Sequence, residues 1–166
     1  VGAFKFRGAC NSVFSLTNNE ASRGVGTHSS GNHAAAVALA AKLRGIKAHV
    51  VMPKTAPEIK KKAVASYGAN ITFCEPTLVA REETLQQVID NTGAFEIHPF
   101  DDPKIIAGQG TATLEFLKDM HKDKVKKVRV ITGKGAIAKE FPFWIEKSSY
   151  IKKFEPTNDG GCWIIT

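Results

Sequence analysis

Short apolar segments alternate with longer segments of helical pattern, and this alternation constrains the fold of the chain more than any other feature. Residues 48–52 and 71–74 are short apolar runs of the kind found in buried strands. Helical patterns follow them over residues 58–67 and 77–91, and each of these patterns ends at a glycine. Strand–helix units in series predict an α/β fold with a doubly wound parallel sheet.

Further segments extend the alternation on both sides. Residues 24–27 are expected to lead, as a strand, into a loop and a helix that ends near Gly45. Residues 96–98 and 128–131 predict two more strands, and an amphipathic helix is expected over residues 111–120. After residue 140 the sequence has neither a clear helical nor a clear strand period, so no element is predicted there.

Two glycines flank a glutamine in the segment Ala107-Gly108-Gln109-Gly110-Thr111, just before the helix expected at residue 111. Such a pair allows the backbone to approach a ligand or another domain closely. Simple punctuation at the start of the helix explains the glycines nearly as well. Both interpretations stay open at this point.

The segment Ser29-Ser30-Gly31-Asn32-His33 lies between a predicted strand and an Ala-rich helix. Free backbone N–H groups and the positive end of the helix dipole make such a loop a potential anion site. A turn that merely caps the helix is the alternative. Ligands of doubly wound sheets bind at the carboxyl ends of the strands, and this position favours a binding loop.

Lys5 stands between Phe4 and Phe6. A lysine in an apolar pocket is desolvated, its pKa falls, and the neutral amine becomes a nucleophile toward carbonyl groups. The alternative is an amphipathic helix start whose lysine extends its amine to water.

Composition limits the classes of partner. The 166 residues carry a net charge of +7, but the lysines cluster at residues 60–62 and 122–127 without interleaved aromatics. Solvated helix faces are therefore expected, rather than a nucleic-acid or membrane surface. No apolar run has the length of a membrane span. The histidines lack metal-ligand spacing, and the three widely spaced cysteines predict a reducing, cytoplasmic setting.

Two stretches together, Phe4-Lys5-Phe6-Arg7-Gly8-Ala9 and Ser29 to His33, resemble the serine racemase and serine/threonine dehydratase (ammonia-lyase) group. These are fold-type II pyridoxal-phosphate enzymes, similar in fold to the tryptophan synthase β-subunit. The similarity is continuous from about Gly2 to Leu117, and four more segments contribute to it: residues 52–57, 67–69, 98–100 and 107–111.

The resemblance implies an amino-acid racemase and/or L-serine/L-threonine ammonia-lyase that acts on the Cα proton. Lys5 would hold pyridoxal 5'-phosphate as a Schiff base and move a proton on one face of the substrate. Ser30 would be the acid/base on the opposite face. Asn32 would hydrogen-bond the ring hydroxyl of the cofactor, Phe4 would pack beside the ring, and residues 29–33 would bind the substrate carboxylate.

The resemblance also implies a domain organisation. Residues 24–101 would form a small α/β domain, whereas residues 1–23 and 102–131 would belong to a larger, incomplete domain. Residues 132–166 are expected to be a divergent tail, and the chain as a whole is expected to be a fragment. The complete protein would be a homodimer.

Two departures from the family pattern concern possible ligands. Gly133 and Gly135 stand where the family has a tetraglycine phosphate loop, but Lys134 and Ala136 replace glycines. Glu155 matches a divalent-metal carboxylate of the racemases, which would bind Mg or Ca, although no second acidic ligand follows it. A non-catalytic fragment or pseudoenzyme with impaired cofactor binding is therefore the alternative function.

Overall fold

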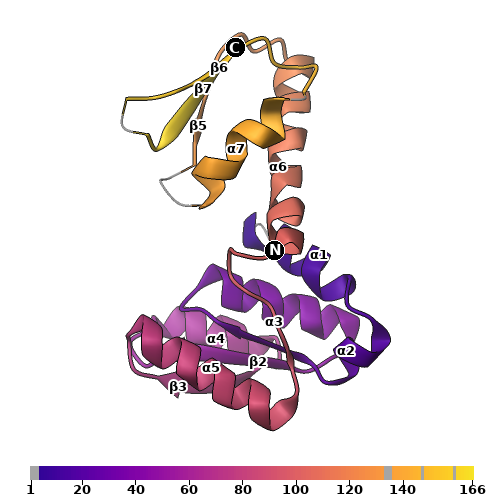
Figure 1. Cartoon of the computed structure of the whole chain (residues 1–166), viewed down its shortest axis with the longest axis vertical. Coiled ribbons are helices and arrows are strands. Elements are labelled where there is room, and N and C mark those ends of the chain that lie inside the picture. Colours follow the sequence, from indigo (N-terminus) through magenta and orange to yellow (C-terminus); the bar gives the residue numbers. More distant parts are fainter. Residues whose placement is uncertain (1–3, 133–135, 147, 159) are drawn as a thin grey trace. The chain divides into compact units, whose positions relative to one another are not determined.

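A computed structural model describes residues 4–132, 136–146, 148–158 and 160–166 (Figure 1). The chain divides into two compact units, Val1–Gly108 and Gln109–Thr166.

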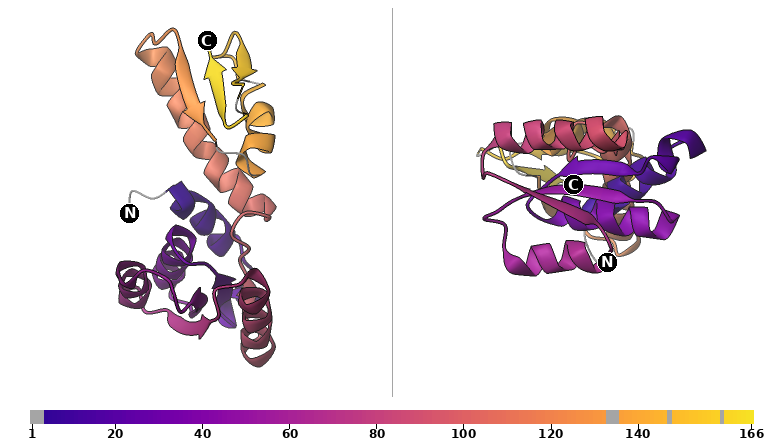
Figure 2. Two further views of the ribbon diagram at one scale, coloured as in Figure 1. Left: turned by 90° about the vertical axis from the view of Figure 1, so that its left-hand side faces the viewer. Right: turned by 90° about the horizontal axis from the view of Figure 1, so that it is seen from below.

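The first unit contains a four-stranded, fully parallel sheet with the strand order β3-β2-β1-β4. Its register places Thr27 of β1 beside Val50 of β2. Helices lie on both faces of this sheet (Figure 2). The elements are α1 (Phe4–Phe14), α2 (Asn18–Ser22), β1 (Val25–His28), α3 (Asn32–Arg44), β2 (Ala48–Pro53), α4 (Glu58–Ser66), β3 (Asn70–Cys74), α5 (Leu78–Thr92), β4 (Phe95–Glu96) and the first residues of α6 (Pro103–Lys122).

Separate apolar cores cover the two faces of the parallel sheet. Val25, Val50 and Met52 pack toward α1, α3 and α4, whereas Val51 packs with Leu85 of α5 on the other face. Side chains of a strand alternate between the faces, so successive residues of β2 serve different cores. The predicted doubly wound α/β arrangement is confirmed for this unit.

The helix ends follow local signals in the sequence. Thr77 accepts a hydrogen bond from the backbone N–H of Ala80 and so caps the start of α5. Gly45 and Gly93 follow α3 and α5 with left-handed φ angles of 72° and 68°, which glycine adopts without strain. The helices predicted to end at these two glycines are confirmed.

Helix α6 differs from the prediction, because it begins at Pro103 rather than at residue 111. Asp102 Oδ1 accepts hydrogen bonds from the backbone N–H groups of Lys104 (2.7 Å) and Ile105 (3.3 Å), and Pro103 tolerates the first helical position. The glycines predicted to open a helix lie inside it. Gly108 instead allows α6 to approach α1, because a Cβ at this position would lie 2.7 Å from Gly8 Cα.

The second unit combines the rest of α6 with a three-stranded antiparallel sheet of order β5-β7-β6. Its other elements are β5 (Val128–Ile131), α7 (Ala136–Glu146), β6 (Phe154–Pro156) and β7 (Cys162–Ile165). The antiparallel sheet differs from the expectation of parallel sheets throughout. The reason is local: Gly160, with φ 66°, and the hydrogen bond from Thr157 N to Cys162 O fold β6 back onto β7.

No element was predicted after residue 140, but α7 continues to Glu146, and β6 and β7 follow it. Phe141 and Ile145 lie one turn apart on α7, and both are fully buried with Leu117 and Ile165. Among the described side chains of α7 these two are the buried ones, and Pro142 between them obscures the helical period. The pattern is therefore too short to recognise before its partners are known.

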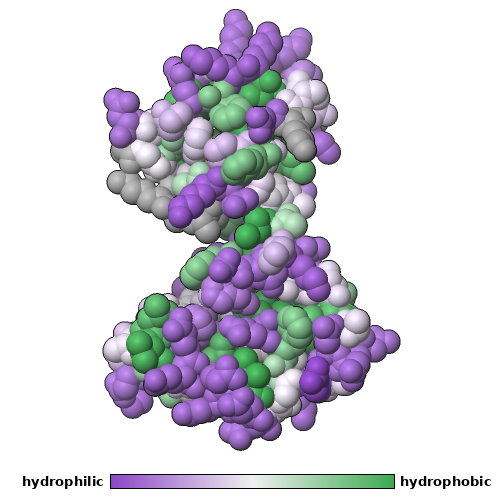
Figure 3. All heavy atoms as spheres, in the orientation of Figure 1, coloured by the Kyte–Doolittle hydropathy of each residue, from purple (hydrophilic) through white to green (hydrophobic). Residues whose placement is uncertain are grey.

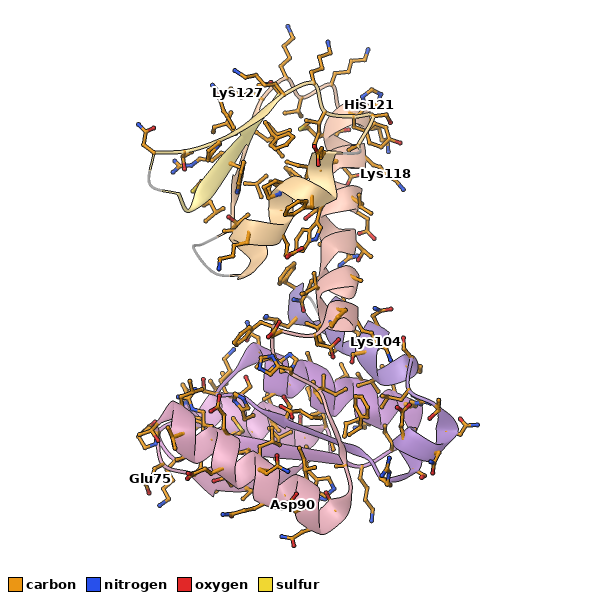
Figure 4. The ribbon with its side chains drawn as sticks, in the orientation of Figure 1. Glu75, Asp90, Lys104, Lys118, His121 and Lys127 are labelled. Atoms are coloured by element: carbon orange, nitrogen blue, oxygen red, sulfur yellow. The ribbon has the colours of Figure 1, made fainter. Side chains whose placement is uncertain are left out.

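Polar side chains cover most of the visible surface of both units (Figure 3). Lys118, His121 and Lys127 project outward from the second unit (Figure 4). Residues 121–127 are all exposed, which confirms that this basic cluster is solvated. Among the described residues, no helix is long and apolar enough to cross a membrane.

Candidate active site

A cleft in the first unit brings together two stretches that are far apart in the sequence. Its volume is about 450 Å³, within the roughly 300–1,000 Å³ of typical small-molecule sites. The lining comes from the start of α1, the β1–α3 loop and the segment after β4: Phe4, Lys5, Ser29, Ser30, Gly31, Asn32, His33, Pro99 and Phe100.

The amine of Lys5 lies at this cleft in the first turn of α1. Its Nζ donates a hydrogen bond of 3.0 Å to the backbone oxygen of Pro99. Among the described residues no carboxylate pairs with the amine, and burial lowers the pKa of Lys5. The desolvated amine expected from the flanking phenylalanines is thus present in the structure, and it is more nucleophilic than a solvated one.

Helix α1 is held in place at its carboxyl end by α3. Arg44 donates hydrogen bonds to the backbone oxygens of Val13 and Leu16, the second at 2.7 Å. A cation at the end of a helix satisfies carbonyl groups that lack partners within the helix. Arg44 thereby connects the helix that carries Lys5 to α3, the helix that follows the loop after β1.

The β1–α3 loop leads into the first N–H groups of α3. Ser29 N donates to Val51 O (3.0 Å), Gly31 N donates to Ser29 Oγ (3.2 Å), and α3 begins at Asn32. Within the described residues, no group accepts a hydrogen bond from the backbone N–H groups of Asn32, His33 or Ala34. The loop therefore has the geometry of an anion site at a helix N-terminus.

Ser30 is exposed at the loop and lines the same cleft as Lys5. Asn32 lines the cleft as well, and its Oδ1 accepts a hydrogen bond of 2.6 Å from Lys60 Nζ. The side chain of Phe4 is 41% exposed on the cleft wall. These three side chains are placed to meet a ligand, whereas their roles stay predictions.

His33 differs from its neighbours because it is almost fully buried. Its Nε2 lies 3.3 Å from Ile97 O, and burial lowers its pKa to about 4. The imidazole is therefore neutral at pH 7. Thr27 Oγ1 donates to the same Ile97 oxygen at 2.7 Å, so this carbonyl ties the loop to the segment that carries Pro99. The side chain of His33 acts as an anchor, and its backbone N–H remains for an anion.

Sequence reasoning missed three residues of the site. Pro99 and Phe100 line the cleft. In the sequence they were noted only as part of a segment that resembles the family, and no role in the site was predicted for them. Lys60 was assigned to a solvated face, but its amine contacts Asn32. No local pattern indicates that contact, because 28 residues separate the two positions.

Two further predicted ligand groups belong to residues 109–166 of the chain. Gly133 and Gly135 lie outside the described residues. Glu155 is exposed on β6, where its carboxylate pairs with Lys153 Nζ at 3.0 Å. In the part of the chain that the structure describes, no group of three histidine, cysteine or acidic side chains is placed to hold a metal ion.

Comparisons with known proteins show which proteins this chain resembles. A serine racemase of Arabidopsis thaliana is 50% identical over 138 residues, which are 82% of this chain and 41% of that protein. A beta-hydroxyaspartate dehydratase of Paracoccus denitrificans is 53% identical over 119 residues, 72% of this chain and 38% of that protein. The chain thus spans about two fifths of the length of these curated relatives.

Solved structures show the same fold. The crystal structure of a T.th. threonine deaminase matches with a TM-score of 0.77 and 39% identity, over 89% of this chain and 47% of that one. The model of the family described as "Pyridoxal-phosphate dependent enzyme" matches residues 1–138. The chain therefore belongs to the family of pyridoxal-phosphate-dependent enzymes.

Proposed function

We propose that the complete protein is a pyridoxal-phosphate-dependent racemase and/or ammonia-lyase that acts on serine or threonine. One observation carries the proposal: a single cleft joins the desolvated amine of Lys5 to the anion-binding start of α3. Relatives named serine racemase and threonine deaminase support the reaction class.

The residues of the cleft fit the cofactor. The Lys5 amine has only the Pro99 oxygen as a hydrogen-bond partner among the described residues, so a carbonyl compound can attach to it without breaking an ion pair. Phe4 and Phe100 supply apolar surface, and Asn32 supplies a polar contact. When bound, pyridoxal phosphate provides an electron sink for the charge left at Cα once its proton is removed.

Different groups of the chain would then transfer the Cα proton and bind the substrate. Lys5 Nζ moves the Cα proton on one face, and Ser30 Oγ moves it on the other. The backbone N–H groups of Asn32 and His33 bind the substrate carboxylate. Transfer across both faces inverts Cα, whereas loss of the β-hydroxyl after proton removal yields the oxo acid and ammonia. Homodimer assembly and a cytoplasmic location belong to the same proposal.

The test begins with cofactor attachment. Pyridoxal phosphate is added to the 166-residue chain, the adduct is reduced with borohydride, and peptides are mapped by mass spectrometry. We expect the label on Lys5, its loss in Lys5→Ala, and an unchanged label in Lys62→Ala, whose lysine is exposed. Labelling spread equally over the surface lysines in all three proteins would refute specific attachment and favour a non-catalytic fragment.

The second test separates the two faces in a full-length protein that carries this sequence. Ser30→Ala is expected to abolish formation of D-serine from L-serine, while pyruvate formation, which needs the Lys5 face, persists. Equal loss of D-serine and pyruvate would contradict the assignment of Ser30 to the second face.

A further inference from the structure

Asn32 begins α3 at the mouth of the cleft, and its side-chain amide has one partner among the described residues. The Nζ of Lys60 lies 2.6 Å from Asn32 Oδ1. Lys60 belongs to the first turn of α4, which packs beside α3 (Figure 1). The contact thus joins two helices of the first unit at the edge of the site.

The chemistry of the pair decides which way the amide faces. A lysine ammonium has three donors and no acceptor, so it can bind only the oxygen of a side-chain amide. Lys60 therefore selects the orientation in which Oδ1 is occupied. The Nδ2 group remains, and among the described residues none accepts a hydrogen bond from it.

We propose that Lys60 is a positioning residue that makes Asn32 a dedicated hydrogen-bond donor toward an anionic oxygen of the bound ligand. The inference rests on the proposed function, because the ligand oxygen belongs to the cofactor or the substrate. A charge-assisted bond to Oδ1 also polarises the amide and strengthens its remaining N–H donors.

The neighbouring lysines of α4 provide contrasts. Lys61 Nζ is occupied by Glu58 Oε1 (2.7 Å) and Lys54 O (2.8 Å). Lys62 is exposed, and its nearby charge is Glu58. Among the described lysines of α4, Lys60 is the one whose amine contacts Asn32. Lys62 carries the same charge on the same helix without this contact, so it is a matched control.

The first experiment needs no cofactor. The side-chain amide resonances of Asn32 are assigned in a ¹⁵N–¹H spectrum by their loss in Asn32→Asp. We expect Lys60→Met to shift this pair of resonances, Lys60→Arg to leave them close to the parent positions, and Lys62→Met to leave them unchanged. Unmoved Asn32 resonances in Lys60→Met would overturn the proposal whether or not the chain binds pyridoxal phosphate.

The second experiment measures the dissociation constant of pyridoxal phosphate and the absorption maximum of the bound form. Losing one charge-assisted contact should weaken binding by roughly three- to tenfold in Lys60→Met, with partial rescue in Lys60→Arg. If Lys60 acts through Asn32, Lys60→Met has no further effect in an Asn32→Ala background. An equal loss in both backgrounds would show that only charge matters and would overturn the positioning role.

The two experiments separate the possible failures. A parent chain without specific cofactor attachment at Lys5 refutes the proposed function for this chain, while the resonance shifts still decide the orientation of Asn32. Specific attachment at Lys5 together with unmoved Asn32 resonances in Lys60→Met refutes the role of Lys60 alone.

Discussion

Gly108 and Gly110 occupy the same helix two residues apart, yet the structure predicts opposite effects of alanine at the two positions. A Cβ at Gly108 would lie 2.7 Å from both Arg7 O and Gly8 Cα and 2.8 Å from Asn11 Cβ. The first two neighbours are backbone atoms, which cannot rotate away. To reach an ordinary contact of 3.4 Å, α1 and α6 would have to separate by about 0.7 Å (3.4 − 2.7).

Two terms set the size of the effect. Alanine is more favourable than glycine by about 1 kcal/mol inside a helix. Overpacking against rigid neighbours costs about 1–3 kcal/mol, so Gly108→Ala should lower the free energy of unfolding by up to about 2 kcal/mol once the helix-propensity gain is subtracted. At Gly110 the nearest atoms are side-chain carbons of Trp144 at 3.6–3.9 Å, an ordinary contact. Gly110→Ala should therefore raise the free energy of unfolding by up to about 1 kcal/mol.

Urea unfolding followed by far-UV circular dichroism measures both variants, and hydrogen exchange locates the change. Gly108→Ala should speed exchange in α1, the helix that carries Lys5, and should weaken cofactor attachment as that helix shifts. Gly110→Ala should leave exchange in α1 unchanged. A Gly108→Ala variant as stable as Gly110→Ala would refute the close approach of α1 and α6.

Three further predictions concern stability. Because burial lowers the pKa of His33 from 6.5 to about 4, the neutral imidazole contributes stability above pH 6.5, and this contribution is lost as the pH falls toward about 4. The free energy of unfolding should therefore fall by about 2 kcal/mol from pH 7.5 to 5. An equal fall in His33→Gln would contradict this. Arg44→Met should cost about 1–2 kcal/mol in urea unfolding because two carbonyls lose their donors, whereas a cost no larger than that of Lys62→Met would disprove the cap. Thr77→Ala should cost about 1 kcal/mol in urea unfolding, most of it recovered in Thr77→Ser, and equal stability of the three proteins would argue against this cap.

Most elements of the first unit could be predicted because their signals are local. Thr77, Gly45 and Gly93 mark helix ends through their own side chains or backbone preferences. The start of α6 was missed, although Asp102 followed by Pro103 is a local signal, because the glycines at 108 and 110 were taken for the boundary. Here close packing of two helices outweighed the low helix propensity of glycine.

The candidate site was predictable to a different degree for each residue. Lys5 and the loop from Ser29 to His33 could be found from their neighbours in the chain and from the resemblance. The contacts of Pro99 with Lys5 and of Lys60 with Asn32 join residues 94 and 28 positions apart. Such pairs depend on how the sheet and its helices fold, and no periodicity within one segment encodes them.

The sequence by itself determined the strand–helix alternation, the helix caps and the chemical types of the candidate site residues, because each depends on a few adjacent side chains. Only the tertiary structure decided that His33 is buried and neutral, that the Lys5 amine meets a carbonyl rather than a carboxylate, and that Lys60 contacts the Asn32 amide. Desolvation and hydrogen-bond partners are properties of the packed molecule. They decide which of the candidate groups can act.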